Sequence, residues 1–374
     1  MTTIVIPTRI RYAFNGGVSE FIRMLAAVAP ECGDSLIDLD GVTINGRFPY
    51  RSRTPVAVLA QRLSHLRTLA FFGSSFPRAP LVFFQTSLNR NALLRDVAFM
   101  GRCWRAGRPF AVFIHGWNEQ FVDILSASPK RLKKLAQLLN NAKRVFVLAP
   151  GFADTLSMWG VDPQNITVET TMIDDSMLTG FDLQKKIDAR DPAQGLKILF
   201  MSRIVKGKGI YQAIEAFQIH KTRFPSSTFT VAGDGEELLA VKDKMRREAV
   251  PGVRFVGFVE GADKAAQLAD ADVFLFPSGY GEGLPIALLE AMAFGNTVIA
   301  RPVGGIGHFL RAPEMGYLEP SLDPERYAIL LDKVAENPDS WVSTARFNHE
   351  FSQHNTLASR VGRRILNEVT KGLE

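Results

Sequence analysis

The feature that most constrains the fold is an alternation, from end to end, of short β-branched or aromatic runs with longer stretches of helical periodicity. Strand, helix, strand repeated in this way is typical of α/β proteins with parallel sheets. Many of the runs are apolar throughout, as strands buried on both faces of a sheet are. Eleven runs are predicted to be strands: 3–6, 36–40, 81–85, 110–115, 144–148, 166–169, 197–202, 228–232, 253–258, 272–276 and 297–300.

Two domains are expected, because 374 residues are enough for each domain to bury its own core. The segment 182–195 is polar, contains Asp191-Pro192 and is predicted to be a linker. This places a Rossmann-like domain at 1–185 and a second domain at 190–355, with a final helix at about 356–374 that can pack back on the first. In doubly wound domains ligands bind beyond the carboxyl ends of the strands, so functional residues are expected there.

Composition argues against several classes of protein. Apolar runs stay shorter than the roughly 18 residues of a membrane span, and the N-terminus lacks the basic and apolar segments of a secretory signal. The two cysteines, Cys32 and Cys103, have no metal-ligand spacing and predict no disulfide framework. A cytoplasmic location is therefore the expectation.

Positive charge is concentrated between Gly41 and Asn118, a stretch with eleven arginines, no lysine and one acidic residue, Asp96. Such a field attracts the phosphates of a substrate, a membrane or a nucleic acid, but it also fits a solvated face with scattered basic residues. We expect contact with the cytoplasmic face of an anionic membrane, and no nucleic acid partner. The reason is a set of interleaved aromatic residues that could enter the headgroup layer or belong to the core: Phe71, Phe72, Phe76 and Trp104.

The stretch with the most chemical information is FPSGYGEGLPIALLEAMAFG, from Phe276 to Gly295. It follows a predicted strand, passes through three glycines and opens a helix with Pro285 in the first turn. The backbone N–H groups of Gly283 and Leu284 are expected at that helix N-terminus, where they would bind an anion.

Two glutamates with seven residues between them, Glu282 and Glu290, complete this stretch. In this setting the pattern resembles the signature of the retaining glycosyltransferase family four, or group 1. The resemblance implies the GT-B fold, with two facing Rossmann-like domains and an interdomain cleft. It also implies that Glu282 contacts hydroxyls of the transferred sugar and that Glu290 accepts hydrogen bonds from the nucleotide ribose. A carboxylate suits a diol because its two oxygens can accept from two hydroxyls.

A second motif, SRIVKGKG, follows the first predicted strand of the second domain. It resembles the S-R-x-x-x-x-K-G of the same family, which places Arg203 and Lys208 as the two cations at the donor diphosphate. Fixed cations stabilise the negative charge that grows on the leaving nucleoside diphosphate. Gly207 stands where the family often has glutamate, so the contacts of this loop are expected to differ.

Further donor contacts are implied by the resemblance at several loops. Gly233 in VAGDG, and Gly257 and Phe258 in VRFVGF, match the loops beside the nucleotide. In the first domain, the glycine pair and the histidine that ends the fourth predicted strand match residues that approach the donor phosphate and sugar: Gly16, Gly17 and His115. Two segments depart from the family, with His308 where glutamate is usual and 170–175 in place of N-G-V-D.

The family's reaction retains the anomeric configuration and needs neither a bound metal nor a cofactor. Consistent with this, the one D-x-D sequence at the carboxyl end of a predicted strand is Asp38-Leu39-Asp40. The expected function is transfer of a hexose-type sugar from a UDP- or GDP-sugar to a glycan or lipid-linked acceptor, in bacterial envelope or exopolysaccharide synthesis. A nucleotide-sugar epimerase or a non-catalytic nucleotide-sugar-binding protein of the same fold remains the alternative. A dinucleotide dehydrogenase is disfavoured because no G-x-G-x-x-G follows the first strand.

Overall fold

The computed structural model describes residues 2–8, 16–44 and 55–373. The chain forms two compact units, of which the first joins 1–172 to 358–374 and the second is 173–357. The predicted linker at 182–195 therefore lies inside the second unit. Residues 173–185 belong to this unit because Ile173 donates its N–H to the carbonyl of Thr356 at 2.9 Å and Phe181 packs on Phe294 with ring centroids 4.7 Å apart.

The first unit contains a parallel sheet of six strands in the order β2-β1-β3-β4-β5-β6. Its central strands are buried on both faces, which explains their continuous apolar sequences. The strand bounds are β1 (Thr2–Val5), β2 (Asp34–Ile37), β3 (Leu81–Leu88), β4 (Phe110–Trp117), β5 (Val145–Val147) and β6 (Ile166–Val168).

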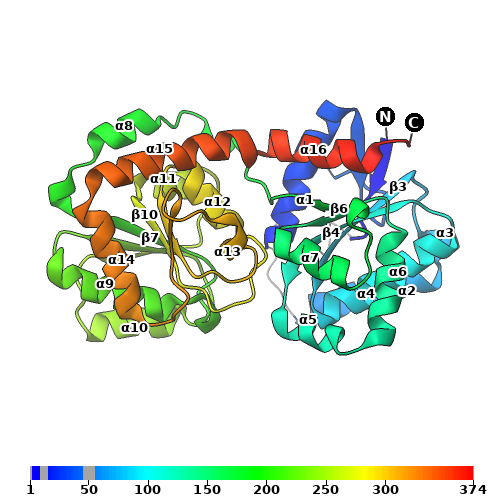
Figure 1. The fold of residues 1–374 in the computed structure, drawn as a ribbon, viewed down its shortest axis with the longest axis horizontal. Coiled ribbons are helices and arrows are strands. Elements are labelled where there is room, and N and C mark those ends of the chain that lie inside the picture. The colour runs from blue at the N-terminus through cyan, green and yellow to red at the C-terminus, as the bar shows by residue number, and fades with distance from the viewer. Residues whose placement is uncertain (1, 9–15, 45–54, 374) are drawn as a thin grey trace. The chain divides into compact units, whose positions relative to one another are not determined.

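The helices of the first unit include the last helix of the chain, α16 (Ala358–Thr370), which packs beside α1 (Gly17–Val28), as Figure 1 shows. Gly362 permits this close approach, since a Cβ at that position would lie 3.2 Å from Cβ of Val28. The other helices are α2 (Pro55–Ala70), α3 (Phe72–Ser75), α4 (Arg90–Arg105), α5 (Glu119–Ser126), α6 (Pro129–Asn140) and α7 (Pro150–Met158).

The second unit contains another parallel sheet of six strands, in the order β12-β11-β10-β7-β8-β9. The strands are β7 (Lys197–Met201), β8 (Thr228–Ala232), β9 (Val253–Gly257), β10 (Val273–Phe276), β11 (Thr297–Ala300) and β12 (Gly316–Leu318). All eleven predicted strands are present in the two sheets. β12 was not among the predicted strands, because three residues are too few to show a period.

Helices cover the second sheet on both faces (Figure 1). One buried link between them is His220 of α9, whose Nδ1 lies 2.6 Å from Asp332 Oδ1 of α14. The helices are α8 (Leu183–Ala189), α9 (Ile210–Arg223), α10 (Leu238–Arg247), α11 (Gly261–Asp270), α12 (Ile286–Ala293), α13 (Ile306–Phe309), α14 (Pro324–Glu336) and α15 (Pro338–Asn355). Across the described residues, every helix is too short or too polar to cross a membrane.

Candidate functional site

The predicted donor residues of the second unit follow the carboxyl ends of four neighbouring strands. Arg203 comes after β7, Gly233 after β8, Phe258 after β9, and the loop that carries Glu282 after β10. Because parallel strands end at the same edge of a sheet, residues far apart in sequence are gathered on this edge. We refer to it as the carboxyl edge of the second sheet.

A buried ion pair connects two of these loops. The Lys208 ammonium donates to Glu282 Oε1, and Ser278 Oγ donates to the same oxygen at 2.8 Å. The side chains of Lys208 and Glu282 are only 9% and 10% exposed. Burial lowers the pKa of Lys208, and the carboxylate of Glu282 opposes that shift. The sequence analysis did not identify Ser278, whose hydroxyl is aligned only by the fold of its loop.

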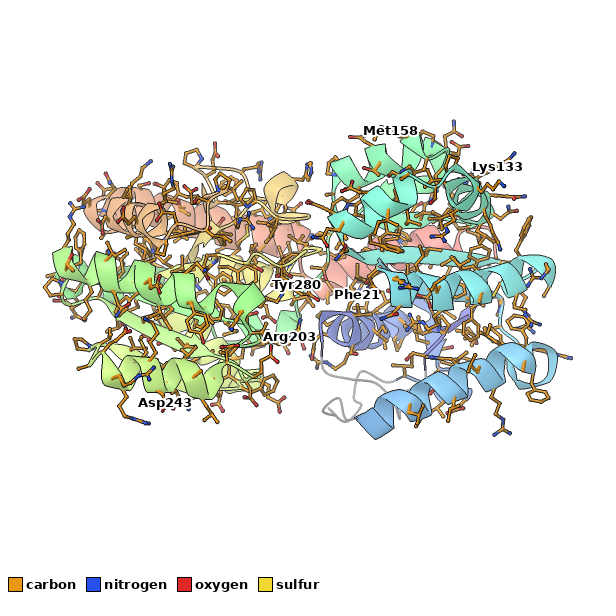
Figure 2. The ribbon with its side chains drawn as sticks, turned by 90° about the horizontal axis from the view of Figure 1, so that it is seen from below. Phe21, Lys133, Met158, Arg203, Asp243 and Tyr280 are labelled. Atoms are coloured by element: carbon orange, nitrogen blue, oxygen red, sulfur yellow. The ribbon has the colours of Figure 1, made fainter. Side chains whose placement is uncertain are left out.

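Arg203 stands next to this ion pair and adds a second cation. Its guanidinium lies 5.9 Å from the centre of the Tyr280 ring, and Lys208 Nζ lies 4.8 Å from the same ring. The positive charge of Arg203 contributes to lowering the pKa of Lys208. Figure 2 shows Arg203 and Tyr280 close together in the second unit. Tyr280, half of which is exposed, was not predicted as a site residue and has no local sequence signal.

Glycines allow the loops of the carboxyl edge to pack backbone against backbone. Gly233 has φ 136°, and a Cβ there would collide with the carbonyl oxygen of Ser202. Its N–H donates to the carbonyl of Gly257 at 2.6 Å, which ties the loops after β8 and β9 together. Phe258 follows Gly257 and is 58% exposed, so its ring is free to contact a ligand.

Glu290 lies on α12, a helix buried on nearly all sides. Its side chain is 5% exposed, and Lys264 of α11 donates to its Oε1 at 2.6 Å. One carboxylate oxygen is thus already occupied by an ammonium group, so the expected bidentate contact with a ribose diol would have to share it. The sequence analysis missed Lys264, because the two residues are 26 positions apart and belong to different helices.

The start of α12 differs from the prediction. The helix begins at Ile286 with Pro285 as its N-cap, so Gly283 and Leu284 lie in the loop before it and not in its first turn. The reason is that Pro285 has ψ 127°, which is extended and not helical. Gly283 accepts a hydrogen bond from Gly305 N–H at 2.8 Å, which holds this loop against the one after β11.

In the first unit, His115 lies within β4 and not at its end as predicted, because the strand continues to Trp117. The pairing with β3 skips His115, since Ile114 faces Thr86 and Gly116 faces Ser87. Such a β-bulge turns a side chain away from the regular alternation. The His115 ring stacks on Phe113 and its Nε2 lies 2.7 Å from Gln85 Oε1. Burial lowers the pKa of His115 to about 3, so the ring is neutral at neutral pH.

The other predicted residues of the first unit lie at the start of α1. Gly16 is its N-cap and Gly17 its first residue, and both are exposed. Trp117, two residues after His115, is 5% exposed and stacks on Phe152 with ring centroids 4.0 Å apart, so it belongs to the core. Asp38 of the D-x-D sequence accepts hydrogen bonds from the N–H groups of Asp40 and Val42, as a turn residue does.

The arginine-rich stretch is only partly described, since Arg47, Arg51 and Arg53 lie outside the described residues. Within it, Phe72 and Phe76 are buried and Arg108 lies over both rings at 5.4 Å, which favours the core alternative for these two residues. Exposed apolar side chains among the described residues of α2 and nearby segments include Leu59, Leu63, Leu66, Phe71 and Trp104. In the described ranges the structure contains no cluster of three metal-ligating side chains.

Residues 184–351 match the protein family described as glycosyl transferases group 1. The chain is 28% identical over 229 residues to the putative colanic acid biosynthesis glycosyltransferase WcaL of Salmonella typhimurium, covering 59% of this chain and 54% of that one. It is 31% identical over 172 residues to the amylovoran biosynthesis glycosyltransferase AmsK of Erwinia amylovora, covering 43% and 42%. The matched segments span about half the length of these relatives.

Solved structures of similar fold cover nearly the whole chain. HepE of Anabaena, in complex with UDP and glucose, matches 99% of this chain and 100% of its own with a TM-score of 0.70 at 16% identity. Sucrose-phosphate synthase of Thermosynechococcus elongatus matches 98% of both chains with a TM-score of 0.71 at 17% identity. These likenesses show that the fold is that of the GT-B glycosyltransferases.

Proposed function

We propose that the chain, whose residues 184–351 match the group 1 glycosyl transferases, transfers a hexose-type sugar from a UDP- or GDP-sugar to a glycan or lipid-linked acceptor. The observation that carries the proposal is the buried pair of Lys208 and Glu282, with Arg203 beside it, at the carboxyl edge of the second sheet. Buried charges are costly, so such a set is typical of a functional site.

The proposed roles follow from charge and position. Arg203 and Lys208 bind the donor diphosphate and stabilise the negative charge that develops on it as the glycosidic bond breaks. Glu282, held by Lys208 and Ser278, accepts from hydroxyls of the transferred sugar, and Glu290 accepts from the ribose. Gly233, Gly257, Phe258, Gly283 and Leu284 line the same edge and supply backbone and ring contacts. In the first unit, Gly16, Gly17 and His115 contact the phosphate and sugar.

The reaction is proposed to retain the anomeric configuration and to need no metal. The donor phosphate accepts the proton of the acceptor hydroxyl, while the two cations offset the charge on the leaving group. Neither the proton transfer to the donor phosphate nor the stabilisation of the leaving group requires His115 to gain or lose a proton, and the ring is neutral at neutral pH. A neutral imidazole next to a sugar hydroxyl can exchange hydrogen bonds with it.

The names of similar proteins guide the choice of substrates. HepE binds UDP and glucose, which makes UDP-glucose the first donor to test. The relatives of colanic acid and amylovoran biosynthesis suggest an acceptor in envelope or exopolysaccharide synthesis. The relatives are glycosyltransferases, so the transferase is favoured over the epimerase and over a non-catalytic binding protein.

The test is a screen of UDP- and GDP-sugars, in which thermal shift measures binding and donor hydrolysis in excess chelator measures turnover. We expect one donor to raise Tm in proportion to the logarithm of its concentration over Kd, and to be turned over with chelator present. Lys208→Met should abolish both effects. Lys206→Met is the matched control, since this lysine is two residues away with its side chain 78% exposed. Activity that is lost with chelator and restored by magnesium or manganese would disprove metal independence.

We also propose that the first unit contacts the anionic inner face of a membrane, as a peripheral protein of the cytoplasm. The support is helix α2, whose leucines Leu59, Leu63 and Leu66 are 57–61% exposed while His65 and Thr68 face inward. Spacings of four and three residues place these leucines on one face of the helix. Arg67 next to them adds a charge that favours anionic headgroups, at about 1 kcal/mol per basic residue.

Vesicle sedimentation tests this location. The chain should bind anionic but not neutral vesicles, and the binding should weaken at high salt. Replacing Leu59, Leu63 and Leu66 by glutamine should abolish it, as should replacing Arg51, Arg53, Arg62 and Arg67. The control is Leu239→Gln on α10, where the leucine is 76% exposed on the second unit. Absence of binding at low salt would refute the membrane contact and leave the transferase proposal standing.

A further inference from the structure

A cavity of about 490 Å³ lies in the second unit, against the opposite edge of the sheet from the donor residues. Its lining includes Lys197, the first residue of β7, and Asp272, which directly precedes β10. The strands therefore begin at this cavity and end at the carboxyl edge. Its volume is within the range of pockets that bind small molecules, and the proposed transfer reaction makes no use of it.

The acidic residues of the lining are all engaged by the protein itself. Asp182 and Asp191 accept from backbone N–H groups of Lys185 and Ala193 at 3.1 and 3.0 Å. Asp270 is paired with Lys197 Nζ at 2.7 Å, and the Oδ2 of Asp272 accepts from Lys197 N–H at 2.9 Å. These carboxylates are satisfied locally and have little need of an external cation.

Arg190 differs from these acidic residues, because its hydrogen-bonding groups are not all satisfied by the protein. Its side chain is 8% exposed and its guanidinium stacks on Trp341 at 4.7 Å. Nε is buried, lies 3.4 Å from Asp272 Oδ1 and has no hydrogen-bond partner, while the terminal nitrogens retain some exposure and are bonded to no described residue. A buried guanidinium nitrogen without a partner is uncommon, because an unsatisfied buried donor is energetically costly.

The rest of the lining is largely apolar. Phe181, Phe294 and Ala266 form part of the wall. Lys186 does not offer its charge to the cavity, because its ammonium donates to the carbonyls of Ala271 and Phe294 at 2.5 and 2.8 Å and to Asn296 Oδ1 at 2.6 Å. Lys185 also lines the cavity, but its side chain is 84% exposed and its ammonium lies 4.0 Å from Asp182 Oδ2. The cavity thus combines one buried cation, Arg190, with an apolar surface.

We propose that this cavity binds a small molecule that has a carboxylate or phosphate group on an apolar or aromatic body. The oxyanion accepts from the terminal nitrogens of Arg190, whose fork matches the spacing of two oxyanion oxygens. The body packs on Phe181 and Phe294. The site is separate from the proposed donor site and does not depend on the transferase assignment.

The experiment is calorimetric titration of the full chain with benzoate and with phenyl phosphate, and with benzyl alcohol as the uncharged analogue. We expect saturable binding of at least one anion and none of the alcohol. Ala266→Trp should weaken binding at least tenfold, because the indole fills the cavity and leaves the pairing of Arg190 with Asp272 intact. Leu239→Trp, which adds the same ring at an exposed position of α10, is the matched control and should bind as the unmodified chain does.

Two further variants assign the binding to this site. Arg190→Lys retains the charge but loses the fork, and should weaken binding by about tenfold, the equivalent of one lost hydrogen bond to a charged group. Arg203→Met removes a cation of the carboxyl edge and should leave binding unchanged. The proposal is overturned if neither anion binds, if Ala266→Trp binds normally, or if Arg203→Met is the variant that loses binding.

Discussion

The two units have the same architecture, a six-stranded parallel sheet covered by helices, but their carboxyl edges differ in chemistry. The second unit gathers charge there, with Lys208, Glu282 and Glu290 all nearly buried. The predicted residue at the corresponding edge of the first unit is His115, which is neutral and packed on Phe113. One scaffold thus carries buried charges at one carboxyl edge and a neutral ring at the other, because the chemistry of an edge depends on the residues that end or follow its strands and not on the sheet architecture.

The two carboxyl edges also differ in how their side chains are held in place. In the second unit the buried charged groups are paired across elements, as Lys208 is with Glu282 and Glu290 is with Lys264. Such pairs hold a charge in place without a bound ligand, so little reorganisation is needed when a diphosphate arrives. His115 is held by the hydrogen bond to Gln85 and by ring stacking, which orient it without any charge.

The largest expected effect is that of Lys208→Met on turnover. Loss of one group that stabilises developing charge lowers kcat by about 100-fold or more. His115→Ala should cost less, because a neutral ring contributes a hydrogen bond and no charge. Steady-state kinetics with the donor found by the screen measures both variants. If His115→Ala were as damaging as Lys208→Met, the contrast between an ionic and an uncharged site would be wrong.

The next effect separates binding from catalysis within the second unit. Arg203→Ala and Glu290→Ala should each weaken donor binding at least tenfold, since a hydrogen bond to a charged group is worth about 1.5–3 kcal/mol. Glu282→Ala should lower kcat more than it weakens binding of the nucleoside diphosphate. Calorimetry gives the affinities for the diphosphate alone and for the full donor, and steady-state kinetics gives kcat. Equal losses of Glu282→Ala for the two ligands would contradict its assignment to the sugar.

A smaller effect is expected on acid stability. The pKa of His115 is about 3 in the folded chain, against about 6.5 when unfolded, so the unfolded state takes up a proton first as pH falls below 6.5. Stability is therefore lost between pH 6.5 and pH 3, by at most about 1.4 kcal/mol per pH unit for this residue. Burial lowers the pKa of His220 in the second unit too, although Asp332 opposes that shift.

Urea unfolding at pH 7 and pH 5 measures this loss. A Trp341→Phe background restricts the fluorescence signal to the first unit, where the other tryptophans lie. His115→Asn should reduce the difference in unfolding free energy between the two pH values, whereas replacing the exposed His354 should not. An unchanged difference in His115→Asn would show that the histidine is not held neutral in the folded state.

The smallest effect is that of Tyr280→Ala. The ring faces both cations, at 5.9 Å from Arg203 and 4.8 Å from Lys208, and cation–π contacts at partly exposed sites are worth about 0.5–1 kcal/mol. We expect a two- to five-fold rise in KM for the donor, of the size that such a contact converts to, and little change in kcat. Tyr280→Phe retains the ring and should behave as the unmodified chain. If KM rose as much in Tyr280→Phe as in Tyr280→Ala, the effect would come from the hydroxyl and not from the ring.

Local pattern was sufficient for the strands and for the main loops. An apolar run such as 110–115 is long enough to show its buried character. The spacing of Glu282 and Glu290 and the positions of Arg203 and Lys208 were readable because each motif is contiguous in the chain. By contrast, β12 has only three residues and is defined by its pairing with β11.

The α/β class and the motifs of the second half could therefore be predicted from the sequence. The partners of those motifs could not, because tertiary packing brings them together. Lys264 reaches Glu290 across 26 residues and Gln85 reaches His115 across 30. The register shift between β3 and β4 gives His115 its direction. These contacts depend on how helices and strands pack, and a sequence pattern does not show how far apart two elements lie in the fold.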